Sequence, residues 1–454
     1  MKNTFVFDDA TLLTPFASEL IQGALNVYDS VIIPELAEPI LLNKPIVLFS
    51  GKHLIVHPKT VIRLHENCGG CMVRNAHPFD GRQNHFPDTY QDHDICVEGG
   101  IWEFGGDGVS PYEDNSVMRS FGESNFFLMD GDGNMTNAAG HEGGGGFILG
   151  VIFLSNVENF TVRKMTIREN GFYGILIAGG KNFRVEDIVF DHNKMDGIHI
   201  NGPSSYGTIQ RISGTTGDDF IALNAWDWNL SAVSFGAIHH IDIDKLSCES
   251  GELRLLPGRK TFDDGSQVEC PIHDCTFSNM EGIYCYKMYQ QPNCTNELTG
   301  ANDKSDIPGR IDRVSFTNIQ VNRVGGAGVS DIAVEALFEI CADCENLLFQ
   351  SIHIQANSSH YDAKTWKMVK VGPKSATWKR GHTDPDNWSE LFDTELICTA
   401  ENITIRAVSI GGEPCTDTDI LIGTSKLSPN LDYPKTTPRG GNGYGIVKNI
   451  YIES

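Results

Sequence analysis

Three aspartates in the middle of the chain have a spacing that suits acid–base chemistry. Asp196 precedes Gly197, and 22 residues after Asp196 the pair Asp218 and Asp219 follows Gly217. Carboxylates held close together cannot all ionise cheaply, so one keeps a proton to donate while another stays ionised. Hydrolysis of a glycosidic bond needs such a pair of carboxyl groups. Aspartates that cap turns or bind a cation would show the same pattern without catalysis, and that alternative stays open.

A repeat of 23 residues predicts the elements that would hold these aspartates together. The segment Gly-Ile-Leu-Ile at 174–177 recurs as Gly-Ile-His-Ile at 197–200, and the same step leads from Ile198 to Ile221. A period in the low twenties, with several short strands per repeat, is typical of a solenoid. Residues one period apart then lie in adjacent rungs, about 4.8 Å apart. We therefore expect the three aspartates to be neighbours on one wall.

Strand-like runs separated by turns continue along most of the chain. They predict an all-β fold, a parallel β-helix built as a single-stranded solenoid of about ten rungs. A stretch with helical periodicity near the start predicts a cap over an open rung, which would otherwise expose unpaired strand edges. We expect an N-terminal helical cap over 1–40 and one β-helix domain over 41–454, with long loops at about 75–93, 105–146 and 356–396.

Charge and composition narrow the partners. The 454 residues carry a formal net charge of -24, which argues against nucleic acid and against an anionic membrane surface. No apolar run reaches the roughly 18 residues of a transmembrane helix, and the first residues lack the layout of a signal peptide. We expect a cytoplasmic protein whose 12 cysteines are reduced and buried. The oligomeric state is left open.

Alternation along the predicted strands indicates which side chains face the wall. If the isoleucines of 197–201 point inward, His199 and Asn201 point outward; the leucines flanking Arg254 place that residue and Glu252 outward in the same way. Strict alternation sends Asp218 outward and Asp219 inward. Both carboxylates reach the wall only if the turn before their strand breaks the pleat.

In this region the chain resembles the polygalacturonase-like family, glycoside hydrolase family 28. Residues 194–197, Lys-Met-Asp-Gly, take the place of the family's NTDG signature, and residues 217–219 match its GDD signature. The resemblance implies a right-handed parallel β-helix and an inverting hydrolase. It also implies that Asp218 is the general acid, and that Asp196 and Asp219 hold and deprotonate the attacking water.

Two further signatures of the family, GHG and RIK, are changed. Glu252 stands where the family has the histidine, and residues 282–287 cover the RIK position. If Ile283 points inward, Tyr284 and Tyr286 replace the arginine and lysine that grip a galacturonate carboxylate in the family. An alternative register retains Lys287 as the lysine and buries both tyrosines. Exposed tyrosines would suit a neutral sugar face.

Other side chains are candidates for holding a sugar. Trp226 and Trp228 closely follow the GDD strand, and they would either stack on a sugar or pack within their loop. Arg254 could hold a carboxylate. The substrate-binding set predicted from the sequence is therefore His199, Asn201, Trp226, Trp228, Glu252, Arg254, Tyr284, Tyr286 and Lys287. Hydrolysis needs no cofactor, and the sequence predicts no metal site.

These patterns predict a glycoside hydrolase that acts by inversion on the ends of plant-derived oligosaccharides, pectic or related. A cytoplasmic location would supply short imported chains, which favours exo-action. Two alternatives stay open on the same fold. A polysaccharide lyase or epimerase would need a strong base and a cation on the sugar carboxylate. A non-catalytic carbohydrate-binding β-helix would explain the two changed signatures.

Overall fold

The chain folds into two compact units. The N-terminal unit comprises Met1–Gly217 and Asn229–Ser234, and the C-terminal unit comprises Asp218–Trp228 and Phe235–Ser454. The computed structural model describes residues 3–8, 11–64, 71–79, 81, 84–104, 127–129, 135–137, 150–171, 173–227, 232–262, 264–289, 294–295, 302–303, 309–322, 336–355, 367–372, 398–422 and 445–453.

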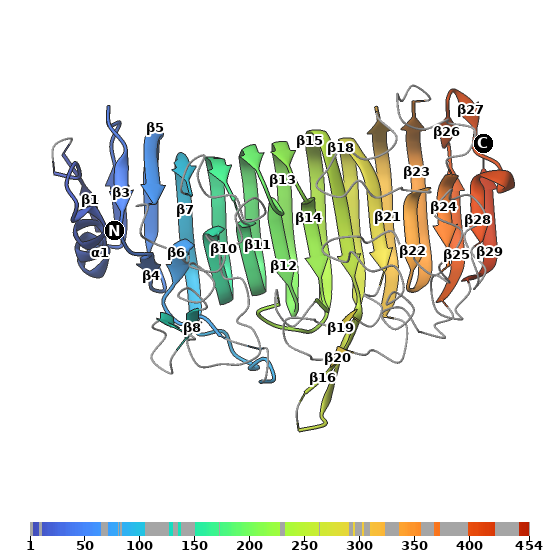
Figure 1. Cartoon of the computed structure of the whole chain (residues 1–454), viewed down its shortest axis with the longest axis horizontal. Helices are drawn as coiled ribbons and strands as arrows, with labels where there is room; N and C mark the ends of the chain where they lie inside the picture. The colour runs from blue at the N-terminus through green and yellow to red at the C-terminus, as the bar shows by residue number, and fades with distance from the viewer. Residues whose placement is uncertain are drawn as a thin grey trace. The chain divides into compact units, whose positions relative to one another are not determined.

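The N-terminal unit is a stack of strands that lie side by side, and neighbouring strands pair in parallel (Figure 1). The 23-residue step sets the pairing of β10 with β11, in which Ile152 faces Ile175 and Phe160 faces Phe183. The strands of the stack are β1 Thr4–Val6, β2 Ser30–Ile33, β3 Ile40–Leu42, β4 Ile46–Leu48, β5 His53–Leu64, β6 Cys71–Asn75, β7 Asp92–Glu103, β10 Gly150–Asn170, β11 Tyr173–Asn193, β12 Ile198–Asn201 and β13 Ser204–Thr216.

A helix and a hairpin complete the described part of this unit. Helix α1, Ala17–Val27, packs the apolar face formed by Ala17, Ile21 and Leu25 toward β2, β3 and β4. That it caps the end of the stack stays a prediction. Strands β8, Phe127–Met129, and β9, Met135–Asn137, pair antiparallel within the region predicted as a long loop.

The C-terminal unit is built in the same way, with parallel strands stacked rung on rung (Figure 1). Phe277, Phe316 and Phe349 form a stack inside it, with ring centroids 4.8 and 5.5 Å apart. Its parallel strands are β14 Asp219–Asn224, β15 Ile238–Leu256, β18 Ile272–Tyr289, β21 Arg310–Val321, β22 Ala336–Cys341, β23 Asp343–Ile354, β24 Lys367–Val371, β25 Cys398–Arg406, β26 Ser409–Ile410, β28 Ile420–Ile422 and β29 Gly445–Glu453.

Short antiparallel pairs decorate this unit. β16, Gly258–Thr261, pairs with β17, Gln267–Cys270, and β19, Cys294–Thr295, pairs with β20, Asn302–Asp303. β26 turns back into β27, Glu413–Pro414, and a 3₁₀ turn, η3, spans Asp417–Asp419.

Both units have the strands of a parallel β-helix, as the sequence predicts, but one of the parallel strands was predicted as loop. Residues 367–371 lie within the predicted loop 356–396, and they form β24, which pairs parallel with β22 and β28. Met368 and Val371 of this strand are buried. The three tryptophans of that loop, at 366, 378 and 388, lie outside the described residues.

Asparagines in the left-handed backbone region mark one corner of the C-terminal stack. Asn318 has a φ of 56°, and its Nδ2 donates a hydrogen bond of 2.6 Å to Oδ1 of Asn279 on the neighbouring rung. Asn402 donates in the same way to Asn346, and Asn449 to Asn402. Asparagine tolerates this backbone region because its short polar side chain can form local hydrogen bonds.

Replacement of Asn318 tests this corner. Asn318→Ala is expected to lower the free energy of unfolding by about 1–2 kcal/mol, because alanine has no relief from the left-handed strain. Asn318→Gly loses the same hydrogen bond without that strain, so it should lose less. Urea unfolding of the two variants beside the wild type measures the difference. Equal losses would assign the effect to the hydrogen bond alone.

The cysteines whose side chains the structure describes form no disulfide, and most of them are buried. Burial raises the pKa of Cys71, Cys248, Cys270 and Cys275 to about 12. These four therefore stay protonated and unreactive in the folded protein. Of the two CxxC pairs, Cys68 lies outside the described residues, and Cys341 and Cys344 form no disulfide.

Three histidines meet at another corner of the C-terminal stack. The His239 ring stacks on His273 at 4.9 Å, and its Nδ1 lies 2.8 Å from Nδ1 of His240. Nδ1 of His273 in turn lies 2.7 Å from Asp274. Burial lowers the pKa of His239, and the neighbouring imidazoles lower it further.

This lowered pKa predicts a loss of stability in mild acid. Below the pKa of about 6.5 of an unfolded histidine, the unfolded chain binds a proton at His239 that the folded chain does not, so unfolding is favoured as pH falls. His239→Gln removes that contribution. The urea midpoint of the variant should fall less between pH 7 and pH 5 than that of the wild type. Parallel pH profiles would contradict the assignment.

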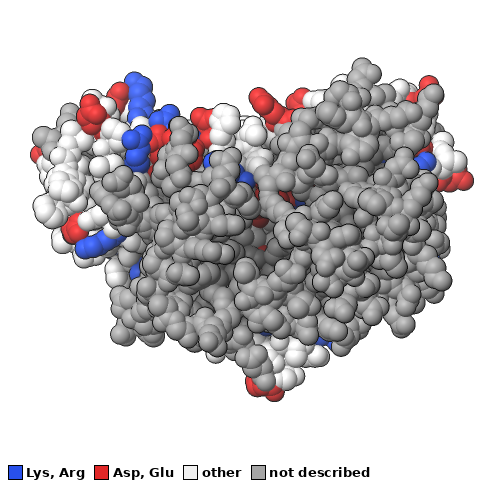
Figure 2. All heavy atoms as spheres, in the orientation of Figure 1, with Lys and Arg blue, Asp and Glu red and all other residues white. Residues whose placement is uncertain are grey.

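Within the described ranges, no helix has the length and apolar character that a membrane crossing requires. Figure 2 shows acidic and basic side chains intermixed over the N-terminal strands at the left of that view, rather than gathered into a field of one sign. Ion pairs also join β7 to β10. Examples are Glu98 with Arg163 at 2.6 Å and Glu98 with Lys164 at 2.7 Å.

Candidate functional site

An irregularity at the start of β14 places two aspartates side by side. Asp219 pairs with Glu252, but the next pair in the ladder is Ile221 with Leu253, so Phe220 is an extra residue on its strand. Such a bulge breaks the alternation of side chains. Asp219 therefore lies on the face of the strand that carries Glu252, although strict alternation would have turned it into the core.

Two cations surround the carboxylate of Asp219. Nε of Arg254 lies 2.7 Å from Oδ2, and Nζ of Lys287 lies 3.7 Å from Oδ1. Asp219 is fully buried, whereas the side chain of Asp218 is 20% exposed and meets Arg254 only at 3.4 Å. Opposite charges favour the ionised form of a carboxyl group. Asp219 therefore has two cations beside it, whereas Asp218 has one longer contact to a cation.

Glu252 joins this cluster from the neighbouring strand. It forms an ion pair with Lys287, and its Oε1 accepts a hydrogen bond of 2.6 Å from the Tyr284 hydroxyl. Both Glu252 and Lys287 are buried.

The register of β18 is the alternative one. Leu253 pairs with Tyr286 and Arg254 with Lys287, so the expectation of two outward tyrosines was wrong. Tyr284 and Tyr286 are buried, and the Tyr286 ring stacks on Phe338 at 4.5 Å. Burial raises the pKa of Tyr286 well above its usual range.

Irregular pairing around Gly251 explains the difference. The ladder between β15 and β18 shifts on both sides of this glycine, which pairs with Ile283, and Gly282 just before that partner has a φ of +88°. If side chains are assigned alternately inward and outward from Ile283, across that break, both tyrosines are placed outward. If the assignment starts instead from Leu253, which pairs with Tyr286, both tyrosines are placed inward, as observed.

The sequence left open whether Trp226 stacks on a sugar or packs within the protein, and the structure shows that it packs. It is buried, and a Cβ atom built on Gly258 would lie 2.6 Å from its ring, so the two segments are in close contact. Its backbone N–H donates to the carbonyl of Leu256. Trp228 lies outside the described residues.

Asp196 forms a second polar group, in the N-terminal unit. Its Oδ2 lies 2.6 Å from Nδ1 of His199, whose Nε2 lies 3.3 Å from Nδ2 of Asn201. Oδ1 of Asn201 accepts the backbone N–H of Val233 at 2.9 Å, so its Nδ2 must donate to the imidazole. The ring is therefore neutral, with its proton on Nδ1 and directed at Asp196.

His199 and Asn201 thus position Asp196 rather than face open solvent. Both are buried, and their part in binding substrate stays a prediction. Asp196 belongs to the N-terminal unit, and Asp218 and Asp219 belong to the C-terminal unit. Their proximity therefore stays a prediction of the 23-residue repeat.

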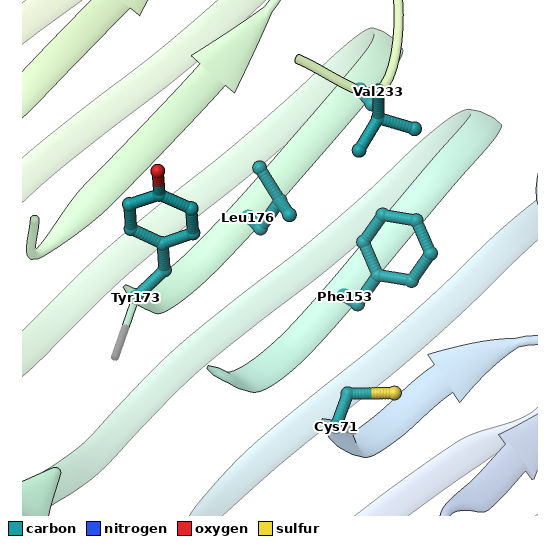
Figure 3. Close-up of a cluster of buried hydrophobic side chains, with 6 residues drawn as sticks. Cys71, Phe153, Tyr173, Leu176 and Val233 are labelled. Carbon is teal, nitrogen blue, oxygen red and sulfur yellow. The ribbon is translucent and has the colours of Figure 1, made fainter. Parts of the chain in front are cut away.

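Sequence reasoning missed the aromatic side of this group. The Tyr173 ring lies 4.3 Å from the ring of His199. Figure 3 shows Tyr173 within a buried cluster, which comprises Cys71, Phe153, Tyr173, Leu176, Ala178 and Val233. The repeat contained the signal, because Tyr173 stands 23 residues before Asp196, and the same step relates the partners Ile175 and Ile198 of β11 and β12.

A groove of about 700 Å³ lies elsewhere on the N-terminal unit, along β5, β7 and β10. Its lining includes His53, Glu98 and Arg163, and none of the residues predicted for the site. The groove therefore contains none of the predicted site residues, and the two carboxylate clusters remain the better candidates for the functional site.

Comparisons with known proteins define the class of fold. The family described as "Right handed beta helix region" matches residues 150–287, and together with the parallel strands this makes the fold a right-handed parallel β-helix. No curated protein matches the chain.

Similar solved structures include hydrolases and an adhesin. Endo-xylogalacturonan hydrolase from Aspergillus tubingensis is 11% identical, with 96% of this chain and 100% of that chain covered and a TM-score of 0.49. Polygalacturonase from Erwinia carotovora ssp. carotovora is 14% identical over 95% and 96%, with a TM-score of 0.48. The Streptococcus pneumoniae surface adhesin PfbA is 14% identical over 96% and 90%, with a TM-score of 0.48. These likenesses do not assign an activity.

Proposed function

We propose that the protein is a glycoside hydrolase that inverts the anomeric centre and acts on the ends of plant-derived oligosaccharides, pectic or related. The observation that carries this proposal is the unequal environment of two adjacent carboxylates. Arg254 and Lys287 both lie beside the buried Asp219, while the partly exposed Asp218 has one longer contact to a cation. A pair whose environments separate its protonation states is the pattern of an acid and a base.

The roles follow from this difference. Asp218 donates a proton to the glycosidic oxygen as the bond to the leaving sugar breaks. Asp219 stays ionised and accepts a proton from the water that attacks the anomeric carbon from the opposite face. Asp196 assists in holding that water. Its role is the one that the family resemblance implies, the repeat predicts that it lies near the other two aspartates, and its contact with His199 keeps its carboxylate oriented.

A screen of pectic and neutral oligosaccharides tests the proposal. Products are read by mass and by anomeric NMR, with Asp218→Asn as the comparison. We expect release of one sugar from a chain end with inverted configuration, and loss of release in the variant. Cleavage at internal bonds would contradict exo-action while leaving hydrolysis in place. An unsaturated product, detected by its ultraviolet absorbance, would instead indicate a lyase.

The second candidate is a carbohydrate-binding β-helix without catalysis. The complete internal pairing of His199 and Asn201, together with the burial of Trp226, favours it, because such side chains also occur in purely structural networks. It predicts that wild type and Asp218→Asn bind the same oligosaccharides and that neither one cleaves any of them.

A further inference from the structure

The cations of the C-terminal cluster already face carboxylates of the protein itself. Arg254 contacts Asp219 at 2.7 Å and Asp218 at 3.4 Å. Lys287 forms an ion pair with Glu252 and lies 3.7 Å from Asp219. Within this cluster two cations therefore meet three carboxyl groups, so each cation already faces an acidic group of the protein itself.

Acidic and basic residues are also paired on the neighbouring rungs. Lys287 pairs in the ladder with Glu339, and Glu339 pairs in turn with Lys370. Glu339 and Lys370 are both buried. Lys287 is therefore in register with a further acidic residue on that side, and the row of charges alternates instead of presenting adjacent cations.

Glu252 is fixed at both ends of its carboxylate. Tyr284 donates a hydrogen bond to Oε1, and Lys287 forms the ion pair. Separating a buried ion pair leaves an uncompensated charge, which costs far more than separating an exposed pair. An incoming carboxylate would have to displace Glu252 from Lys287 or add a further negative charge to the cluster.

We propose that the site accepts an uncharged sugar where Lys287 lies and rejects a uronate there, with Glu252 as the specificity-determining residue. This inference rests on the proposed hydrolase function and names the substrate class of that same site. A neutral sugar presents hydroxyl groups, which exchange hydrogen bonds with the paired charges without adding to them. A uronate meets like charge at short range, where the repulsion is only partly screened.

A matched pair of substrates tests the inference. Pectic oligosaccharides are compared with the same oligosaccharides after chemical reduction of each carboxyl group to a hydroxymethyl group, so that length and linkage are unchanged. The wild type should turn over the reduced set with a kcat/KM at least about tenfold higher, the ratio that one unfavourable charge contact of about 1.4 kcal/mol produces. The preference should lie mainly in KM.

Glu252→Gln then tests the residue. Glutamine keeps an oxygen that accepts from Tyr284 and removes the negative charge, so the preference for reduced sugars should shrink or reverse. Glu281→Gln, which changes an exposed carboxylate on β18, should leave the ratio as in the wild type. Circular dichroism checks the fold of each variant. If Glu252→Gln does not fold, the ratio of the wild type decides alone.

Each outcome has one meaning. A reduced-sugar preference that Glu252→Gln narrows supports the inference. A wild-type preference for uronates overturns it and leaves the hydrolase proposal intact, and an unchanged ratio in Glu252→Gln removes the assigned role of that residue. No turnover of either set overturns the hydrolase proposal, and the inference falls with it.

Discussion

Replacing Asp218 by asparagine is expected to lower kcat on the best oligosaccharide of the screen by about 10²–10⁴-fold, the usual contribution of a general acid. Asparagine has nearly the shape of aspartate but no proton to donate to the leaving oxygen. KM should change little, because the amide still fills the space beside Arg254. Initial rates over a range of substrate concentrations, with wild type and variant purified in parallel, measure both constants.

The leaving group separates an acid from a merely structural aspartate. An aryl glycoside whose phenol leaves without protonation should recover much of its rate in Asp218→Asn, whereas natural glycosides should not. Asp264→Asn, which changes an exposed turn residue in the hairpin of β16 and β17, is the matched control and should behave as wild type. An Asp218→Asn enzyme with full activity on natural glycosides would remove Asp218 from the mechanism.

The part of the fold that the sequence predicts best is the part where rungs have equal length. A step of 23 residues takes Ile175 to Ile198, and the two residues are indeed partners. In the C-terminal unit the step grows to 39 residues between Ile272 and Ile311. Loops of unequal length hide the period there, and β24 was missed for that reason.

The site was harder to predict from the sequence, because the inward–outward alternation of side chains is interrupted at two places in these strands. Counting alternate residues shows that Asp219 can reach the wall only if the pleat breaks near the start of its strand. The extra residue Phe220 provides that break. The shift around Gly251 had no such signal, since neither strand shows by its own sequence which residues it pairs with. Register is fixed by partners, and a one-residue error turns every side chain to the other face.

The residue types alone also could not show that these aromatic side chains are buried. Tryptophan and tyrosine serve equally well in cores and in sugar sites. Trp226 is buried because its neighbour is Gly258, and only a glycine at that position leaves room for the ring. For Tyr284 the ring is buried while its hydroxyl reaches Glu252, an arrangement that neither of the two expected registers contained in full.

Lys287→Met is expected to lower the free energy of unfolding by about 3–5 kcal/mol, as for the loss of one partner from a buried ion pair. The change leaves the buried carboxylates of Glu252 and Asp219 without a cation that they now share. Urea unfolding followed by circular dichroism and tryptophan fluorescence measures the loss. Lys245→Met is the control, because that ammonium group is exposed and lies 3.6 Å from Asp244. It should change stability by no more than about 0.5 kcal/mol.

The double variant Lys287→Met with Glu252→Gln separates the pair from the rest of the cluster. With both charges removed, no carboxylate at 252 remains unpaired, so the double variant should be more stable than the sum of the two single losses implies. Additive losses would show that the two side chains act independently. In that case Lys287 would remain available to an incoming carboxylate, and the basis for excluding uronates would be lost. The same thermodynamic cycle therefore tests how the cluster is held together and which sugars it admits.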